Sequence, residues 1–467
     1  MTKNRAYALD ALRGYAILTM ILCSAIAFGV LPGWMYHAQT PPPSHTFNPS
    51  VYGITWVDLV FPFFLFAMGA AFPFSIGKKI ERGMAKRIIL WDSLKRGLKL
   101  TYFAIFVQHM YPWVVSAPQD TYSWWIALFS FVLLFLAFTR IPYAIASWKR
   151  QLIQFSAYAG SIALVLLVHY AHGRVFSLAY SNIILLVLAN MAVIGSICYF
   201  FTYSHPRVRI AILPFILALL ISAETPESWA YVVLHYSPFP WLYQFHFLKY
   251  LVMVLIGSVA GEFLKTWLTE KAAPSFATSA QKKIGITLVL CLLLIIANLY
   301  GLYMRYLVTN LMVTSVLLLG LFFVVKGKSR TPVLWRKLYH LGSYILLLGL
   351  FLESFQGGIR KDDTTLSYLF VTTGLACFAL IIFSILCDVY RFKILTKPLT
   401  MIGQNPMLAY VSAELVIMPI LHLLGLNTYL DLLNNGAATG FLRGVIVTAL
   451  SLIFTLFFSK LKLFWRT

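Results

Sequence analysis

The sequence predicts an all-α, polytopic transmembrane helix bundle, and three observations support this class. Hydrophobic residues make up 60% of the 467 positions and charged residues only 11%, which leaves too little polar surface for a water-soluble globule. The apolar runs are about 18 to 25 residues long, which is the length that an α-helix needs to cross roughly 30 Å of hydrocarbon. Short polar loops separate these runs. Because lipid cannot satisfy open backbone groups, each run is expected to be helical.

About fourteen such spans follow one another, and the sequence shows no obvious internal repeat or low-complexity linker between them. Residues 1–467 are therefore expected to form a single transmembrane domain. The spans near residues 106, 215 and 411 have the weakest apolar signal. The fourteen predicted spans are centred near residues 21, 66, 106, 132, 161, 190, 215, 254, 292, 317, 346, 377, 411 and 450.

Basic residues predict the orientation of the chain. The net charge of +22 raises the question of nucleic acid binding, but the placement of the charges favours membrane topology instead. If both termini are cytoplasmic, alternate loops place 31 of the 37 Lys and Arg residues on the cytoplasmic side. The positive-inside rule describes this bias, which predicts an even number of spans and no nucleic acid partner. The six basic residues left for the other side are Arg174, Lys249, Arg305, Arg360, Lys361 and Arg443.

Several common signatures are absent from the sequence. Residues 1–13 are polar and charged, and no small-residue cleavage site follows the first apolar run, so no cleavable signal peptide is expected. The five cysteines all fall in apolar runs, which predicts neither a disulfide framework nor a zinc site, and no metal ligands are expected. The sequence contains no glycine-rich phosphate loop and no GxSxG hydrolase elbow.

Two histidines stand just before the second span, in the stretch from Trp34 to Phe64. In the predicted topology, His37 and His45 lie in an irregular extracytoplasmic loop rich in Pro, Ser, Thr and Asn. Histidine exchanges a proton near neutral pH, because its unperturbed pKa is about 6.5. Asp58 begins the apolar run, where a carboxylate is costly unless it faces protein, water or a partner. Asp58 could anchor the helix, pair with a histidine or take part in a reaction.

Other polar residues interrupt the apolar runs. Asp10 and Arg13 are three residues apart on one helical face, so we expect a local ion pair there. Alternatively, Arg13 with Lys78 and Lys79 could form a cationic mouth for a substrate that carries phosphate. Polar side chains in the later spans would be costly in lipid, so some of them are expected to line a hydrated cavity. They include Glu262, Glu353, Asp388, Asn405, Glu414 and His422.

Motifs near both ends of the chain resemble one enzyme family. The stretch ALDALRGYAILTMIL is followed by YHA and by GITWVDLVFPFFLFAMGAA, and the C-terminal part contains LSYLFVTTGLACFALIIFSILCDV, MIGQNPMLAYVSAELV and KLKLFWRT. In order and spacing these motifs are similar to those of the heparan-α-glucosaminide N-acetyltransferase family, transmembrane acyltransferases with many bacterial relatives. The similarity covers residues 1–100 and 335–467, whereas residues 175–350 look expanded.

The resemblance implies transfer of an acetyl group from cytosolic acetyl-coenzyme A to an amino sugar or glycan on the far side of the membrane. The family's catalytic histidine corresponds to His37 by the His-Ala dipeptide, although its distance from the Gly-Ile-Thr motif would suit His45 better. We favour His37. The family asparagine corresponds to Asn405, which would donate to the thioester carbonyl or to the pantetheine arm. The expected location is the inner membrane of a bacterium, and a homodimer is left open.

The resemblance also defines the expected site, with departures on the acceptor side. Ser24 replaces a usual asparagine, and Ser412-Ala413-Glu414 replaces a Gly-His-Glu, which leaves the sugar and the choice between N- and O-acylation open. The expected catalytic residues are His37, His45 and Asp58, the coenzyme A ligands are Arg13, Lys78, Lys79 and Asn405, and the acceptor ligands are Asp10, Ser24, Glu353 and Glu414.

Two other classes of function compete with the acyltransferase. A sugar or glycan transporter without chemistry would use Asp58, Glu353 or Glu414 as proton relays, but no repeat between the halves and no matched pair of broken helices supports it. A purely structural subunit would leave the polar residues unexplained. Consumption of acetyl-coenzyme A separates the acyltransferase from both alternatives.

Overall fold

The structure is a computed structural model that describes residues 5–140, 146–270, 278–326 and 330–466. Within these ranges the regular elements are helices. The predicted all-α bundle is therefore confirmed. Three of the basic residues counted for the cytoplasmic side lie outside the described ranges, namely Lys3, Lys271 and Lys328.

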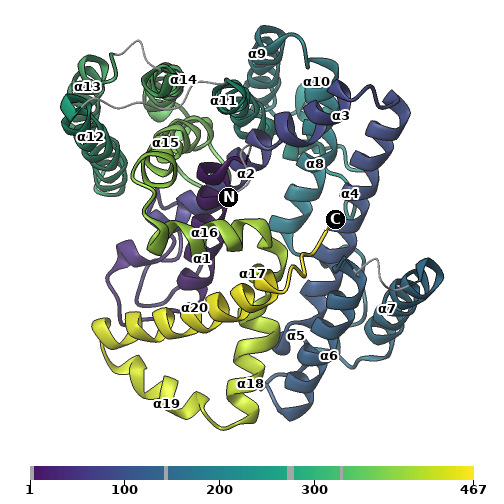
Figure 1. The fold of residues 1–467 in the computed structure, drawn as a ribbon. Coiled ribbons are helices and arrows are strands. Elements are labelled where there is room, and N and C mark those ends of the chain that lie inside the picture. Colours follow the sequence, from purple (N-terminus) through teal and green to yellow (C-terminus); the bar gives the residue numbers. More distant parts are fainter. Residues whose placement is uncertain (1–4, 141–145, 271–277, 327–329, 467) are drawn as a thin grey trace.

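The core of the bundle is built around α15 (Leu366–Ser384), all 19 of whose residues are buried. This helix contacts α1 (Tyr7–Ala25), α2 (Val60–Ala70), α11 (Leu251–Thr269) and α14 (Arg330–Phe351). In Figure 1, α1 lies near the middle of the view, while α14 and α15 separate it from the outer helices at one corner. Apolar side chains around the whole circumference of α15 explain this position, because such a helix has no polar face for water.

Outer helices expose apolar side chains instead of polar ones. At the edge of the view in Figure 1, α7 (Ser147–Leu167) and α13 (Leu307–Val324) each contact few other helices. Phe155 of α7 is 70% exposed and Val316 of α13 is 69% exposed. Exposed apolar surface of this extent is stable in hydrocarbon and not in water. The chain is therefore a multi-pass membrane protein.

The remaining elements complete the bundle, and three short π-helical turns lie within or directly after longer helices. The π turns are η3 (Pro73–Gly77), η7 (Ile385–Val389) and η8 (Ala413–Ile417), and the 3-10 turns are η1 (Gly33–Met35), η2 (Trp56–Leu59), η4 (Ala171–Gly173), η5 (Phe245–Tyr250), η6 (Leu352–Gly357) and η9 (Leu432–Asn435). The other α-helices are α3 (Lys78–Glu81), α4 (Lys86–Met110), α5 (Pro112–Val115), α6 (Thr121–Phe138), α8 (Ile183–Phe201), α9 (Pro206–Ser222), α10 (Trp229–His235), α12 (Thr278–Tyr303), α16 (Lys393–Gln404), α17 (Pro406–Ser412), α18 (Met418–Leu423), α19 (Asn427–Asp431) and α20 (Ala437–Lys460).

Twelve helices in the described part of the chain are long and apolar enough to cross a membrane, against the fourteen predicted spans. The predicted spans near residues 106 and 215 are the two that are missing, and they correspond to α4 and α9. The first half of α4 carries several charged residues, and α9 is only 17 residues long. Both numbers are even, and the count of fourteen stays a prediction.

Contacts at its two ends show that α9 nevertheless connects opposite faces of the bundle. We call the face with the basic stretches 78–99 and 460–466 the basic face. Near the start of α9, Arg209 pairs with Glu262 of α11 at 2.8 Å. Lys265 follows Glu262 by about one turn of α11 and pairs with Glu81 on the basic face. Just beyond the end of α9, Glu224 bonds Gln356, which belongs to the opposite face.

A pair of glycines lets α1 and α16 cross in close contact. A Cβ atom at either Gly14 or Gly403 would collide with a backbone carbonyl oxygen of the other helix. Membrane helices approach this closely where small residues remove the side chains between them. The neighbours of the two glycines, Arg13 and Gln404, consequently line the same cavity on the basic face.

Candidate functional site

The turn that opens α2 builds the first part of the site, on the face opposite the basic one. Thr55 caps the short helix η2, and Asp58 closes a capping box with it. Asp58 Oδ2 accepts hydrogen bonds from the backbone N–H groups of Thr55 (2.9 Å) and Ala38 (3.3 Å) and from the Thr55 hydroxyl (3.2 Å). The Tyr368 hydroxyl of α15 donates to the Asp58 carbonyl oxygen at 2.7 Å. These bonds fix the carboxylate and leave its Oδ1 atom for another partner.

That partner is His37, whose Nδ1 atom lies 2.8 Å from Asp58 Oδ1. An ionised carboxylate only accepts hydrogen bonds, so Nδ1 donates the proton and Nε2 keeps a lone pair. The Asp58 side chain is 2% exposed, whereas the His37 side chain is 38% exposed. The pair therefore presents a basic nitrogen at this face, in the arrangement that orients the base of hydrolase triads.

His45 is occupied within its own loop. Its Nε2 atom accepts a hydrogen bond from the Gly29 backbone N–H at 2.7 Å, and its Nδ1 atom lies 3.3 Å from the Thr40 carbonyl oxygen. The ring packs edge-on against Tyr36 and Phe28, with centroid distances of 4.5 and 5.2 Å. With both ring nitrogens engaged, His45 stabilises the fold of the loop, and His37 is the histidine with a nitrogen available for chemistry.

A second loop, residues 358–365 before α15, brings a cation to the histidine. The side-chain amide of Gln39 bonds both the backbone N–H and the carbonyl oxygen of Asp362, which ties this loop to the histidine loop. Lys361 Nζ lies 3.3 Å from Nδ1 and 3.4 Å from Nε2 of His37. The site on this face thus contains an imidazole, a buried carboxylate and an ammonium group.

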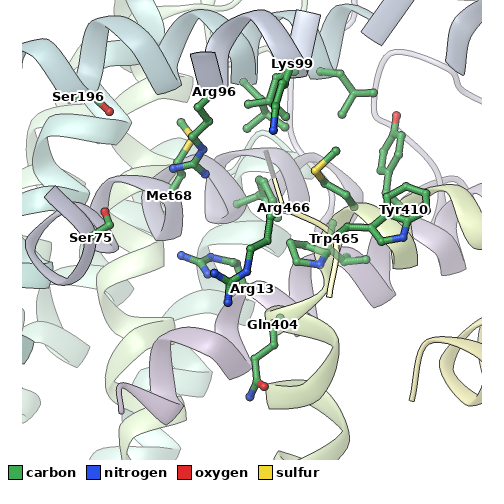
Figure 2. Close-up of a pocket in the computed structure, with 18 of the residues that line it drawn as sticks. Arg13, Met68, Ser75, Arg96, Lys99, Ser196, Gln404, Tyr410, Trp465 and Arg466 are labelled. Atoms are coloured by element: carbon green, nitrogen blue, oxygen red, sulfur yellow. The ribbon is translucent and has the colours of Figure 1, made fainter. Parts of the chain in front are cut away.

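On the basic face a cavity of about 730 Å³ opens between α1, α2, α4, α8, α16 and α17. Figure 2 shows Arg13, Arg96, Lys99 and Arg466 directed into the same space. Two other cations of the lining are paired, Arg5 with Asp10 at 2.7 Å and Lys79 with Asp92 at 2.6 Å. Asp10 also lies 3.8 Å from Arg13, which confirms the local ion pair that the sequence predicted. The four cations drawn in Figure 2 form a cluster of positive charge that suits an anion carrying several negative charges.

The inner end of this cavity is apolar and approaches His37. Ile17, Met20, Phe61, Phe64 and Met68 line it, from α1 and α2. Phe61 follows Asp58 by three residues, about one helical turn. At the start of α2, the cavity lining therefore lies about one helical turn from Asp58, the partner of His37.

Asn405 holds the C-terminal segment against this cavity. It is fully buried, its amide nitrogen donates to the Leu463 carbonyl oxygen at 3.0 Å, and its amide oxygen accepts from the Trp465 backbone N–H at 3.1 Å. Each end of the Asn405 amide makes one hydrogen bond to the C-terminal segment, and a direct bond from Asn405 to a thioester or pantetheine arm stays a prediction. Asn405 thereby places Trp465 and Arg466 in the lining.

Comparison with known proteins places the chain in a family. A family model described as a domain of unknown function, DUF5009, matches residues 5–264, which is more than half of the chain. The chain belongs to the DUF5009 family. No curated protein matches it. The DUF5009 match contains His37, Asp58 and Arg96, whereas Lys361 and the C-terminal part of the cavity lie beyond it.

The structure places the other predicted site residues of this DUF5009 chain as follows. Asp10, Arg13 and Lys79 line the cavity on the basic face, and Lys78 is not among its lining residues. The Ser24 hydroxyl donates to the Ile21 carbonyl oxygen of its own helix. The remaining two are acids of later elements. Glu353 is buried, pairs with Arg305 and accepts from the Ser367 hydroxyl at 2.9 Å, and the half-buried Glu414 lies in the π turn η8.

Sequence reasoning missed several residues that the structure brings to the site. Arg96 and Lys99 were not named as ligands, although their spacing of three residues places both on one face of α4. Trp465 and Arg466 lie in the KLKLFWRT motif but were not predicted as lining residues, because they reach the cavity through the contact of Asn405 with the C-terminal segment. Gln404 reaches it through the close crossing of α1 and α16.

Proposed function

We propose that the protein is a membrane acyltransferase that moves an acetyl group from acetyl-coenzyme A to an amino sugar or glycan across the membrane. The observation that carries this proposal is the arrangement of two half-sites. A cationic cavity opens on the basic face, and its apolar end lies about one helical turn from a His-Asp pair at the other face. We infer that the basic face is cytoplasmic and that the protein resides in the inner membrane of a bacterium.

The cavity suits coenzyme A chemically. The phosphates of coenzyme A match a cluster of guanidinium and ammonium groups, because charge-assisted hydrogen bonds to phosphate are among the strong ones. Arg13 also donates to the Ala67 carbonyl oxygen at 3.3 Å, which orients its guanidinium beside the cavity. The apolar inner end then accommodates the thinner pantetheine arm and carries the thioester toward His37.

The histidine site supplies the base for the transfer. His37 Nε2 takes the proton of the acceptor amine or hydroxyl while the lone pair of the acceptor attacks the thioester carbonyl carbon. The carbonyl oxygen becomes an oxyanion. When the C=O bond forms again, the C–S bond breaks and the coenzyme A thiolate takes the proton from the imidazolium. Asp58 holds the imidazole in the required tautomer and stabilises its charged form. An acyl-imidazole on His37 is the covalent variant of this route.

The test is transfer of labelled acetyl from acetyl-coenzyme A to a panel of amino sugars by the purified protein. General base catalysis contributes about 10² to 10⁴ in rate, so His37→Ala is expected to lose activity by that factor. His45→Gln should retain catalysis when folded, since its nitrogens hold the loop rather than an acceptor.

Thermal stability of each variant separates a loss of chemistry from a loss of folding. If the wild-type protein neither transfers acetyl to any acceptor nor binds acetyl-coenzyme A, the acyltransferase proposal fails and a transporter becomes the leading interpretation.

A further inference from the structure

Cations are scarce on the face of the histidine site, yet four of them lie in or beside the loop of residues 358–365. Lys249, Arg305, Arg360 and Lys361 belong to the six basic residues that the topology leaves for this side. Arg305 and Arg360 both lie over the ring of Tyr52, at 5.6 and 5.3 Å from its centroid. This concentration beside a single histidine calls for a chemical reason, because cations are not favoured on this side by the topology.

Three of the four cations have partners of their own. Arg305 pairs with Glu353, and Arg360 donates to the Pro49 carbonyl oxygen at 3.2 Å. Lys249 lies over the Tyr250 ring, 5.5 Å from its centroid. These contacts hold the two loops and the adjoining helices together, and they account for these three residues structurally.

Lys361 differs from the other three. Among the described residues it has no carboxylate within ion-pair distance, and its contacts are the two ring nitrogens of His37. The acid behind the ring, Asp58, already serves His37, Thr55 and Ala38. The Lys361 ammonium is therefore a half-buried charge at the reacting nitrogen, without a carboxylate of its own.

The backbone around Lys361 is held in place. The Gly53 N–H donates to the Ile359 carbonyl oxygen at 2.8 Å, and the Thr364 hydroxyl lies 3.0 Å from the Tyr250 hydroxyl. With Gln39 bonded to Asp362, the loop is fixed on both sides of the lysine. The fixed backbone therefore keeps the Lys361 side chain beside His37.

The oxyanion of the proposed reaction needs a donor, and the expected one is engaged elsewhere. Asn405 uses both ends of its amide on the C-terminal segment. In the proposed reaction the attacking nitrogen or oxygen of the acceptor is hydrogen-bonded to His37 Nε2. The carbonyl oxygen is bonded to the carbon under attack, so it lies two bonds from the attacking atom. Lys361 Nζ, 3.4 Å from Nε2, is within reach of that oxygen.

We propose that Lys361 is a catalytic residue whose ammonium group stabilises the oxyanion formed when the acceptor attacks the thioester. This inference rests on the proposed acyltransferase function. A cation fixed at the point where negative charge develops stabilises the transition state more than the ground state, and so raises the turnover number rather than the affinity for substrates.

The experiment compares Lys361→Met and Lys361→Arg with the wild type in steady-state acetyl transfer, with Lys249→Met as the matched cation change beside the same loop. Removal of one oxyanion donor typically costs about 10² to 10³ in kcat, and we expect that loss for Lys361→Met with little change in either KM. Lys361→Arg keeps the positive charge and should recover a large part of the rate. Lys249→Met should behave like the wild type.

Each outcome decides between the two proposals. Activity of Lys361→Met near that of the wild type, or a loss confined to KM, would reject the oxyanion role and leave the acyltransferase intact. The oxyanion role would also be rejected if Lys361→Arg showed no more activity than Lys361→Met. A wild-type protein that transfers no acetyl would reject the acyltransferase and the role of Lys361 together. Circular dichroism and acetyl-coenzyme A binding confirm that each variant is folded.

Discussion

The carboxylate of Asp58 divides its two oxygens between two tasks. Oδ2 belongs to the helix cap, where backbone N–H groups hold it, and Oδ1 faces the imidazole of His37. The cap uses only Oδ2, so the helix cap alone does not explain why Oδ1 faces a half-exposed histidine. The helix cap and the proposed chemistry therefore depend on the same side chain, and a variant that keeps the cap can separate them.

We expect Asp58→Asn to lower kcat by about 10² to 10⁴ while leaving the KM for acetyl-coenzyme A nearly unchanged. The amide oxygen can still accept from Thr55, but the amide nitrogen would face the Nδ1 proton of His37, which favours the wrong tautomer. The measurement is steady-state transfer at saturating acceptor. Asp362→Asn makes the same charge change on the neighbouring loop and should leave kcat unchanged. An active Asp58→Asn enzyme would contradict the proposed pairing.

At this scale the sequence predicted part of the site. Pairing of Asp58 with a nearby histidine was one of its expectations, and the structure brings Asp58 to His37. Motif spacing could not separate His37 from His45, because the difference arises when the loop folds back and His45 packs on Phe28 and Tyr36. Their catalytic roles stay predictions.

Among the elements, the C-terminal segment after α20 completes the cavity. It returns past α6, where Thr139 and Trp465 form an isolated antiparallel bridge, and it ends against Asn405. Nothing in the local sequence predicts this path, since the contact joins residues about 60 positions apart. The apolar periodicity that predicted the long helices carries no information on such a return.

Asn405→Ala should release this segment and weaken the binding of coenzyme A. Two backbone groups would lose their partners, at a cost of about 1–3 kcal/mol each if they stay buried, so the segment is expected to detach and withdraw Arg466 from the cavity. Isothermal titration calorimetry should show a several-fold weaker affinity for coenzyme A, and Arg466→Met should show a similar change.

The control for this prediction is Lys393→Met, which removes an exposed cation of α16 outside the cavity lining. Its affinity for coenzyme A should match the wild type. Unchanged affinity in both Asn405→Ala and Arg466→Met would mean that the C-terminal segment has no part in binding the donor.

Over the whole molecule, the two half-sites lie on opposite faces of the bundle. The cluster of Arg13, Arg96, Lys99 and Arg466 is on the basic face, and His37 with Lys361 is on the other. The fold class followed from composition, and the distribution of basic residues predicts that the basic face is cytoplasmic. The cavity itself could not be predicted, because side chains from helices far apart in the sequence and from the C-terminal segment form it.

Sealed vesicles provide the test at this scale. Acetyl-coenzyme A should support transfer only from the compartment that contacts the basic face, and the acceptor should be modified only in the other compartment. Proteoliposomes of known orientation, with the donor either enclosed or added outside, distinguish the two arrangements. Permeabilised vesicles serve as the control, since they should be active with either addition. Transfer with donor and acceptor on one side of an intact membrane would contradict the arrangement.

The crossing of α1 and α16 at Gly14 and Gly403 also makes an evolutionary prediction. Neither helix has room for a side chain from the other at this point, so one position cannot enlarge unless the pair moves apart. Among natural relatives, small residues at these two positions should therefore occur together or be lost together. This pair, more than three hundred residues apart in the chain, could therefore separate relatives that keep the cavity on the basic face from those that share only the N-terminal half.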